Sequence, residues 1–174
     1  MDEHEEYVAP RARGPRLLGM MFLALVAAAA VGRWAAQPRV PDGPAEEITF
    51  EQLHDGAEVV RIKGMAHYAS TITQTVPGGL FGEDTTYYLY GFFPEHATTA
   101  GAIPLLVRTQ RKPERLVTFE VMTVEGALGR PTSRVVPPST EAMLSKRTDY
   151  WFADEVLLLQ ARRITSEDGV WTAP

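Results

Sequence analysis

Hydrophobic and polar positions divide the chain into one long apolar run and a following region with the two-residue period of β-strands. The apolar run is Leu17–Ala36, and its one charged residue is Arg33. An α-helix of this length is about 30 Å long, which matches the hydrocarbon core of a bilayer. The pattern predicts a transmembrane signal-anchor over residues 17–36 that contacts the lipid bilayer. The residues that we assign to this anchor include Leu17, Phe22, Leu25, Val31 and Trp34.

The residues on either side of this run predict its orientation. Residues 1–16 form a polar tail that we expect to be disordered. We expect it to be cytoplasmic, because three arginines precede the run, whereas only Arg33, near the far end of the run, and Arg39, after it, lie on the other side. Residues 37–47 contain several prolines and form a linker, so we expect the next domain on the extracytoplasmic side, periplasmic or extracellular. Two alternatives stay open. Ala28–Ala30 fits the cleavage site of a signal peptide, and the run also suits a buried helix or an organelle-targeting segment.

The soluble domain is predicted over residues 48–165 and opens with a short helix. Thr49 and Gln52 have the spacing of a capping box, which predicts a helix over Phe50–Asp55 that stops at Gly56. From Ala57 the period changes to two. One long strand is expected there, with a bend or bulge at Gly64. Its apolar face comprises Val60, Ile62, Ala66, Tyr68 and Ile72, and Arg61, Lys63 and His67 lie on the other face.

Four further elements follow. Three strands, Thr85–Phe93, Ile103–Thr109 and Leu116–Val124, are expected to form an antiparallel meander. A helix over Thr140–Arg147, capped by Ser139, precedes a last strand over Asp154–Ile164. Residues 166–174 are expected to form a loose C-terminal tail, with packing of Val170 and Trp171 against the domain as the alternative. Inward positions on the second and third strands of the meander are Ile103, Leu105, Val107, Val117, Phe119 and Val121, and outward positions are Arg108, Thr118 and Glu120.

These elements predict a mainly β protein. The N-terminal transmembrane helix is followed by a small antiparallel β-barrel with one or two short helices. Five strands with little helix resemble an OB-fold, in which the helix follows the third strand. Here the helix follows the fourth strand, so a β-sandwich or a pleckstrin-like barrel is the alternative.

Composition excludes several chemistries. The chain carries 17 Lys and Arg against 22 Asp and Glu, a net charge of −5, so nucleic acid is not an expected partner. It contains no cysteine, so disulfides and thiolate sites are excluded. The four histidines lack the spacing of a metal site, and no P-loop or G-x-S-x-G motif occurs. We therefore expect no metal, no cofactor and no enzymatic activity.

The candidate interaction residues lie in two places. A basic group around the turn after the third strand faces tyrosines of the preceding strand, and two apolar side chains occupy the tip of a glycine-rich loop. The basic group and the tyrosines suit a surface that holds single-stranded nucleic acid or a glycan, and the loop tip suits a membrane or a partner. Each group also has a purely structural interpretation. The basic group would be a solvated hairpin beside core tyrosines, and the loop tip would fold back over the core. The residues are Leu80, Phe81, Tyr88, Tyr90, Arg108, Arg111, Lys112 and Arg115.

Phe50-x-x-Leu53 and Val60-Arg61-Ile62-x-Gly64, behind a membrane anchor, resemble the layout of the periplasmic haem chaperones of cytochrome c maturation. The resemblance implies a membrane-anchored small barrel. That family holds its attachment histidine in a His-x-x-x-Tyr signature after the last strand. Here Arg162–Ser166 is followed by neither His nor Tyr, so the resemblance carries no haem site to this chain.

Two functions are therefore expected from the sequence. The first is a single-pass membrane protein whose extracytoplasmic β domain docks to a protein partner as a non-enzymatic accessory or assembly subunit. The second is an OB-like barrel that binds a lipid, a glycan or single-stranded nucleic acid through its aromatic strand and basic hairpin.

Overall fold

A computed structural model describes residues 41–56, 59–78, 82–97, 101–113, 118–132, 135–147 and 149–173. The protein is mainly β in this part of the chain. The elements, in order, are β1 (Glu46–Glu47), the 3₁₀ helix η1 (Phe50–Gln52), β2 (Val60–Val76), β3 (Thr85–Phe93), β4 (Gly101–Thr109), β5 (Phe119–Gly129), α2 (Pro138–Arg147), β6 (Tyr150–Ser166) and β7 (Gly169–Thr172).

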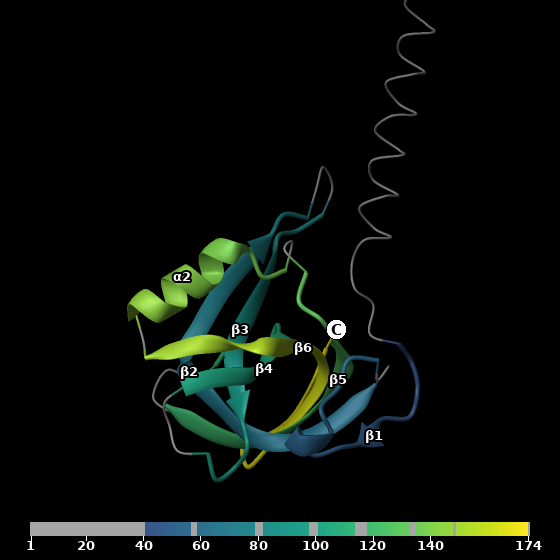
Figure 1. Ribbon diagram of the computed structural model, residues 1–174. Helices are drawn as coiled ribbons and strands as arrows, with labels where there is room; N and C mark the ends of the chain where they lie inside the picture. The colour runs from purple at the N-terminus through teal and green to yellow at the C-terminus, as the bar shows by residue number, and fades with distance from the viewer. Residues whose placement is uncertain are drawn as a thin grey trace, which may run out of the picture. The chain divides into compact units, whose positions relative to one another are not determined.

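Five strands form a ring (Figure 1). β2 pairs with β3, β3 with β4, β4 with β6, β6 with β5, and β5 pairs back with β2. The β4–β6 pair is parallel and the other four ring pairs are antiparallel. Two expectations are thereby corrected. The ring is not entirely antiparallel, and β5 does not continue a meander from β4, because β6 lies between them.

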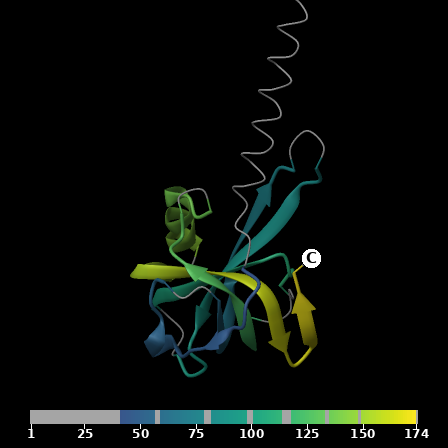
Figure 2. The same cartoon turned by 90° about the vertical axis from the view of Figure 1, so that its right-hand side faces the viewer.

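Two short strands extend the ring. β1 pairs in parallel with the start of β2, and β7 pairs antiparallel with the end of β6. Figure 2 shows β7 folded back beside β6. The prediction of a loose tail over residues 166–174 is therefore wrong for Gly169–Thr172. Trp171 packs against the core, whereas Val170 points away and is 58% exposed.

The long strand β2 is confirmed, but its irregularity lies beyond Gly64. His67 pairs with Gly91 and Ile72 pairs with Leu89, so four residues of β2 oppose a single residue of β3. The Ser70 side chain bridges the two strands where their backbone pairing is interrupted. Its hydroxyl accepts a hydrogen bond from the Gly91 N–H (2.9 Å) and donates one to the His67 carbonyl (2.7 Å). Beyond this bulge the two strands extend past the ring as an arm (Figures 1 and 2).

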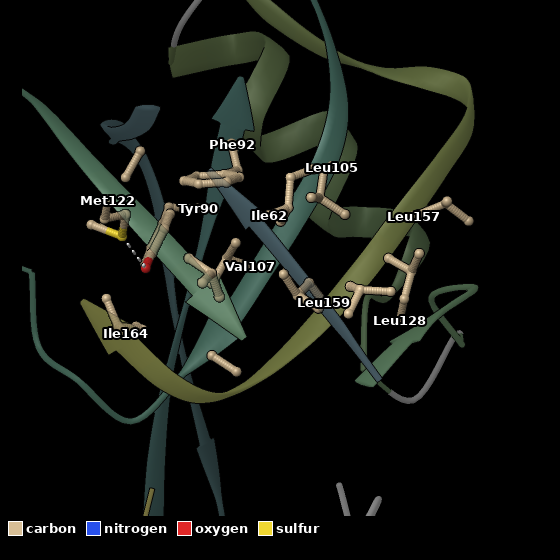
Figure 3. Packing of buried hydrophobic residues seen from close by; sticks show 14 of the residues in the cluster. Ile62, Tyr90, Phe92, Leu105, Val107, Met122, Leu128, Leu157, Leu159 and Ile164 are labelled. Carbon is tan, nitrogen blue, oxygen red and sulfur yellow. Dashed lines mark hydrogen bonds between the residues drawn. The ribbon is translucent and has the colours of Figure 1, made fainter. Parts of the chain in front are cut away.

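The interior of the ring is filled with side chains. Tyr90, Phe92, Leu105, Val107 and Leu159 are at most 1% exposed and converge there (Figure 3). A second cluster lies on the outer face under α2 and is formed by Ile103, Leu106, Leu144 and Tyr150. β3 and β6 therefore have apolar residues on both faces because one face packs inside the ring and the other packs in the outer cluster.

Several predicted inward and outward positions on β4 and β5 are corrected by the structure. The β4–β6 register shifts at Pro104, so Ile103 packs in the outer cluster, while Leu105 and Val107 face inward as predicted. On β5 the predicted faces are reversed. Met122 and Val124 are buried in the interior, whereas Val121 is 42% exposed.

Several element boundaries differ from the predictions. The bond from the Thr49 N–H to the Gln52 side chain is present (2.9 Å), but the helix ends at Gln52 rather than Asp55. α2 begins at Pro138, so Ser139 lies inside the helix rather than capping it; proline is favoured in this first turn because its missing N–H needs no partner there. β5 continues to Gly129 and β6 begins at Tyr150, so both strands are longer than predicted.

Within the described residues, no helix combines the length and the apolar character needed to cross a membrane. The predicted anchor over residues 17–36, with Leu17, Phe22, Leu25, Val31 and Trp34, lies outside that part of the chain and stays a prediction.

Candidate functional site

Three of the predicted interaction residues lie outside the described part of the chain. They are Leu80, Phe81 and Arg115. The others are placed by the structure, and they do not form the open surface that the sequence suggests. Tyr90 is 1% exposed and belongs to the interior of the ring, while Tyr88 is partly buried and Lys112 is exposed.

Arg111 closes an ion-pair network at the end of this interior. Its guanidinium donates to both carboxylate oxygens of Glu120, at 2.8 and 3.2 Å. The Tyr68 hydroxyl donates to the same carboxylate, and the Tyr68 ring meets the Tyr90 ring edge-on at 5.2 Å. Glu120 was expected to face outward; it faces inward because the faces of β5 are reversed.

The charges of this network are stable at neutral pH. Burial alone would raise the pKa of Glu120, but the hydrogen bonds from Arg111, Tyr68 and Ser166 outweigh it and hold the pKa below its usual value. Burial, the neighbouring Tyr90 and the Glu120 carboxylate all raise the pKa of Tyr68. The hydroxyl therefore remains a donor, and Arg111 is engaged in structure rather than free for a ligand.

Arg108 is on the outer face of β4, as predicted, but it is buried there rather than exposed. It is 4% exposed, and its guanidinium carbon lies 3.6 Å from the centre of the Tyr87 ring. One guanidinium nitrogen donates to the side-chain oxygen of Gln160 at 3.0 Å. Arg108 does lie on the outer face of the sheet, in register with Leu89 of β3 and Gln160 of β6, but other side chains cover it.

A second charged network lies on the outer face of β2, β5 and β6. Glu125 accepts from Arg61 (2.8 Å) and from Arg162 (2.9 Å). These hydrogen bonds, that from Arg61 above all, lower the pKa of Glu125. The Arg162 guanidinium also donates to the carbonyls of Pro41 and Gly43, at 2.8 and 2.6 Å, so it fixes the first described residues to the domain.

A shallow depression of about 300 Å³ adjoins this network. It is lined by Arg61, Thr123, Glu125, Arg163 and Thr165. Because the Glu125 carboxylate is already bonded to two arginines, it has little capacity left to act as a general base.

His67 is buried rather than solvated. Its Nε2 lies 3.1 Å from the Tyr150 hydroxyl, and its ring contacts those of Phe93, Phe119 and Tyr150. Burial lowers the pKa of His67, so the imidazole is neutral at pH 7.

The sequence reasoning missed the exposed apolar side chains at the start of β6 and on α2. Trp151 is 52% exposed and Met143 is 43% exposed. Tyr150 and Phe152, on either side of Trp151, pack in the outer cluster, so the alternation of β6 turns Trp151 away from it. The aromatic triplet before Asp154 was the available signal that the strand begins earlier than predicted.

In the described part of the chain, no group of three or more histidine and acidic side chains is arranged to hold a metal ion. Comparison with protein-family models, with curated proteins and with solved structures found no match. The function is therefore argued from this chain alone.

Proposed function

We propose that this chain is a single-pass membrane protein whose extracytoplasmic, OB-like domain is a non-enzymatic docking subunit of a membrane or envelope complex. The apolar run of residues 17–36 supports the anchor, since its length suits a bilayer. The arginines before it support an N-terminus on the cytoplasmic side and a domain on the other.

The ring of strands supports the OB-like assignment. Five strands close through β2, which is long and bulged enough to pair with β3 along one half and with β5 along the other. OB-folds are small, partly open rings of this kind, and they bind their ligands on outer faces and loops. The position of α2, between β5 and β6, departs from the usual OB order.

The observation that carries the docking function is Trp151. Because the interior of the ring is filled, recognition must use an outer surface, and a tryptophan that is 52% exposed on a strand is an uncommon surface residue. Tryptophan is enriched among the residues that dominate binding energy at protein interfaces. Met143 adds a second exposed apolar side chain on α2, which packs against β6.

Arg162 supports the same function through its contacts with the residues that precede β1. Residues 41–43 belong to the predicted linker from the anchor, and Arg162 binds the carbonyls of Pro41 and Gly43. β1 then pairs with β2, and Ile48 enters the core. We infer that an anchor so close in sequence to the domain would hold it near the bilayer, where a membrane partner is within reach.

The test is photo-crosslinking in intact membranes. A photoreactive amino acid replaces Trp151 in one full-length variant and exposed Thr172 of β7 in a control. We expect one discrete adduct at position 151 and none at position 172. Gentle detergent extraction should yield a larger complex that Trp151→Ser disrupts and that Val170→Ser, a matched exposed apolar change, leaves intact.

Three outcomes would contradict the proposal. They are a wild-type protein that elutes alone after gentle extraction, equal crosslinking at both positions, and recovery of the intact, unclipped protein in the soluble fraction.

A further inference from the structure

The buried cation Arg108 has no counter-ion in the part of the chain that the structure describes. Among the described residues its one hydrogen bond goes to the neutral amide of Gln160, and no carboxylate is paired with it. Its Nε is buried and has no hydrogen-bond partner there. Burying an arginine without an anion is costly, because burial takes away the hydration of the guanidinium without supplying an opposite charge.

Arg111 shows how the same domain treats a structural arginine. It lies three residues further along the chain, its side chain is also mostly buried, and its guanidinium donates hydrogen bonds to both carboxylate oxygens of Glu120. The less buried of the two arginines, Arg111, therefore has a carboxylate partner, whereas the more buried Arg108 is paired with a neutral amide. The Tyr87 ring compensates Arg108 in part, since a cation over an aromatic face is stabilised, but this contact leaves the edge of the guanidinium unsatisfied.

We propose that Arg108 is the recognition residue of a carboxylate-binding site on the outer face of β3, β4 and β6. Tyr87 occupies the flat face of the guanidinium and Gln160 takes one terminal nitrogen, so the Nε edge is left for a ligand. That edge presents two parallel N–H groups, which match the two oxygens of a carboxylate.

Charge selects a carboxylate over a phosphate. Arg108 offers one positive charge at this place, and the nearby Arg111 is already neutralised by Glu120. A singly charged carboxylate balances one guanidinium, whereas a phosphate dianion would bring a second negative charge without a partner. Because Arg108 is 4% exposed, a covering side chain must move as the ligand enters, and partly exposed Tyr87 is the side chain in direct contact.

The experiment follows the Arg108 side chain in the full-length protein in detergent. Arginine labelled with ¹⁵N at Nε gives one N–H resonance for each side chain, and the resonance that Arg108→Lys removes is that of Arg108. Sodium acetate is titrated against sodium chloride at equal ionic strength, with inorganic phosphate as a third arm. We expect acetate to shift the Arg108 resonance in a saturable manner, and chloride and phosphate to leave it unchanged.

Thermal unfolding supplies the second measurement. Acetate should raise the Tm of the wild-type protein and not that of Arg108→Met, because ligand that binds only the native state stabilises it. Arg108→Met should also unfold at a higher temperature than the wild type without ligand, by about 3 °C or more, since it removes a buried unpaired charge. Arg163→Met, which removes an exposed arginine from another face, is the matched control. It should change neither the Tm without ligand nor the rise in Tm that acetate causes.

The proposal is independent of docking, so a failed crosslink at Trp151 does not decide it. It is overturned if acetate leaves the Arg108 resonance unmoved or if phosphate shifts it more strongly than acetate. An Arg108→Met variant that is less stable than the wild type would likewise show that the arginine is a structural part of the sheet. If that variant does not fold, the wild-type titration still gives the answer.

Discussion

Gly64 lies where three chain segments meet, and an added methyl group has no room there. A Cβ at this position would lie 2.5 Å from the Phe93 carbonyl oxygen and 2.8 Å from ring carbons of Phe50 and Phe92. Overpacking of a core costs about 1–3 kcal/mol when side chains can yield. One of these obstacles is a backbone atom in the β2–β3 pair, so we expect Gly64→Ala to cost at least about 3 kcal/mol.

Gly129→Ala is the matched control. Gly129 is also a strand glycine with no positive φ, and nothing lies within 4 Å of the position its Cβ would take. Alanine reduces the freedom of the unfolded chain without straining such a site, so this change should stabilise the domain by about 0.4–1 kcal/mol. The two substitutions add the same methyl group and should act in opposite directions.

Urea unfolding of the full-length protein in detergent, followed by tryptophan fluorescence, measures both changes. With a slope of about 1–3 kcal/mol per molar urea, Gly64→Ala should lower the midpoint by about 1 M or more. Adding Phe50→Leu relieves one of the three contacts and should recover less than half of this loss. A Gly64→Ala midpoint equal to that of the wild type, or full recovery by Phe50→Leu, would refute the reasoning from the backbone contact.

Three further predictions concern charged groups. Because burial lowers the pKa of His67 in the folded state, the unfolded chain binds the proton more readily. The free energy of unfolding should therefore fall as the pH drops below about 6.5. Urea unfolding measured from pH 7.5 to pH 5.5 should show this fall in the wild type and in His54→Gln, whereas His67→Phe should not show it. Glu120→Gln leaves Arg111 without its anion and should cost about 3 kcal/mol in the same assay, whereas Glu120→Gln combined with Arg111→Met should recover most of it. Arg162→Lys releases the Pro41 and Gly43 carbonyls and should raise amide hydrogen exchange over residues 42–47 about tenfold; Arg163→Lys should leave exchange there unchanged.

Local patterns predicted the strands well where one segment determines its own structure. Thr85–Phe93 was predicted with the same bounds as β3, because its β-branched and aromatic residues strongly favour a strand. The long strand β2 was also predicted as one element. Its bulge was not found, since the cause is the Ser70 side chain bonded to a strand that lies about twenty residues away in sequence.

Facing and pairing could not be read from the same patterns. β5 has apolar residues at both odd and even positions, because Phe119 contacts His67 on the outer side and Met122 fills the interior. Alternation identifies a buried face only when the other face meets water. The parallel β4–β6 pair, likewise, depends on contacts between segments separated by β5 and α2, and no local signal encodes such a crossover.

The basic hairpin shows most clearly why charge in a sequence is a poor guide to a surface. Arg108 and Arg111 were grouped with Lys112 because the three lie within five positions of one another. Of the three, only Lys112 is exposed, since neighbouring side chains cover Arg108 and most of Arg111. Arg111 is explained by Glu120, a partner that the strand register supplies. Among the described residues, Arg108 has the Gln160 amide and the Tyr87 ring as partners but no carboxylate. A domain that neutralises one buried arginine and leaves its neighbour unpaired bears a cost that stability alone does not require, and such a cost is expected where a ligand completes the pair.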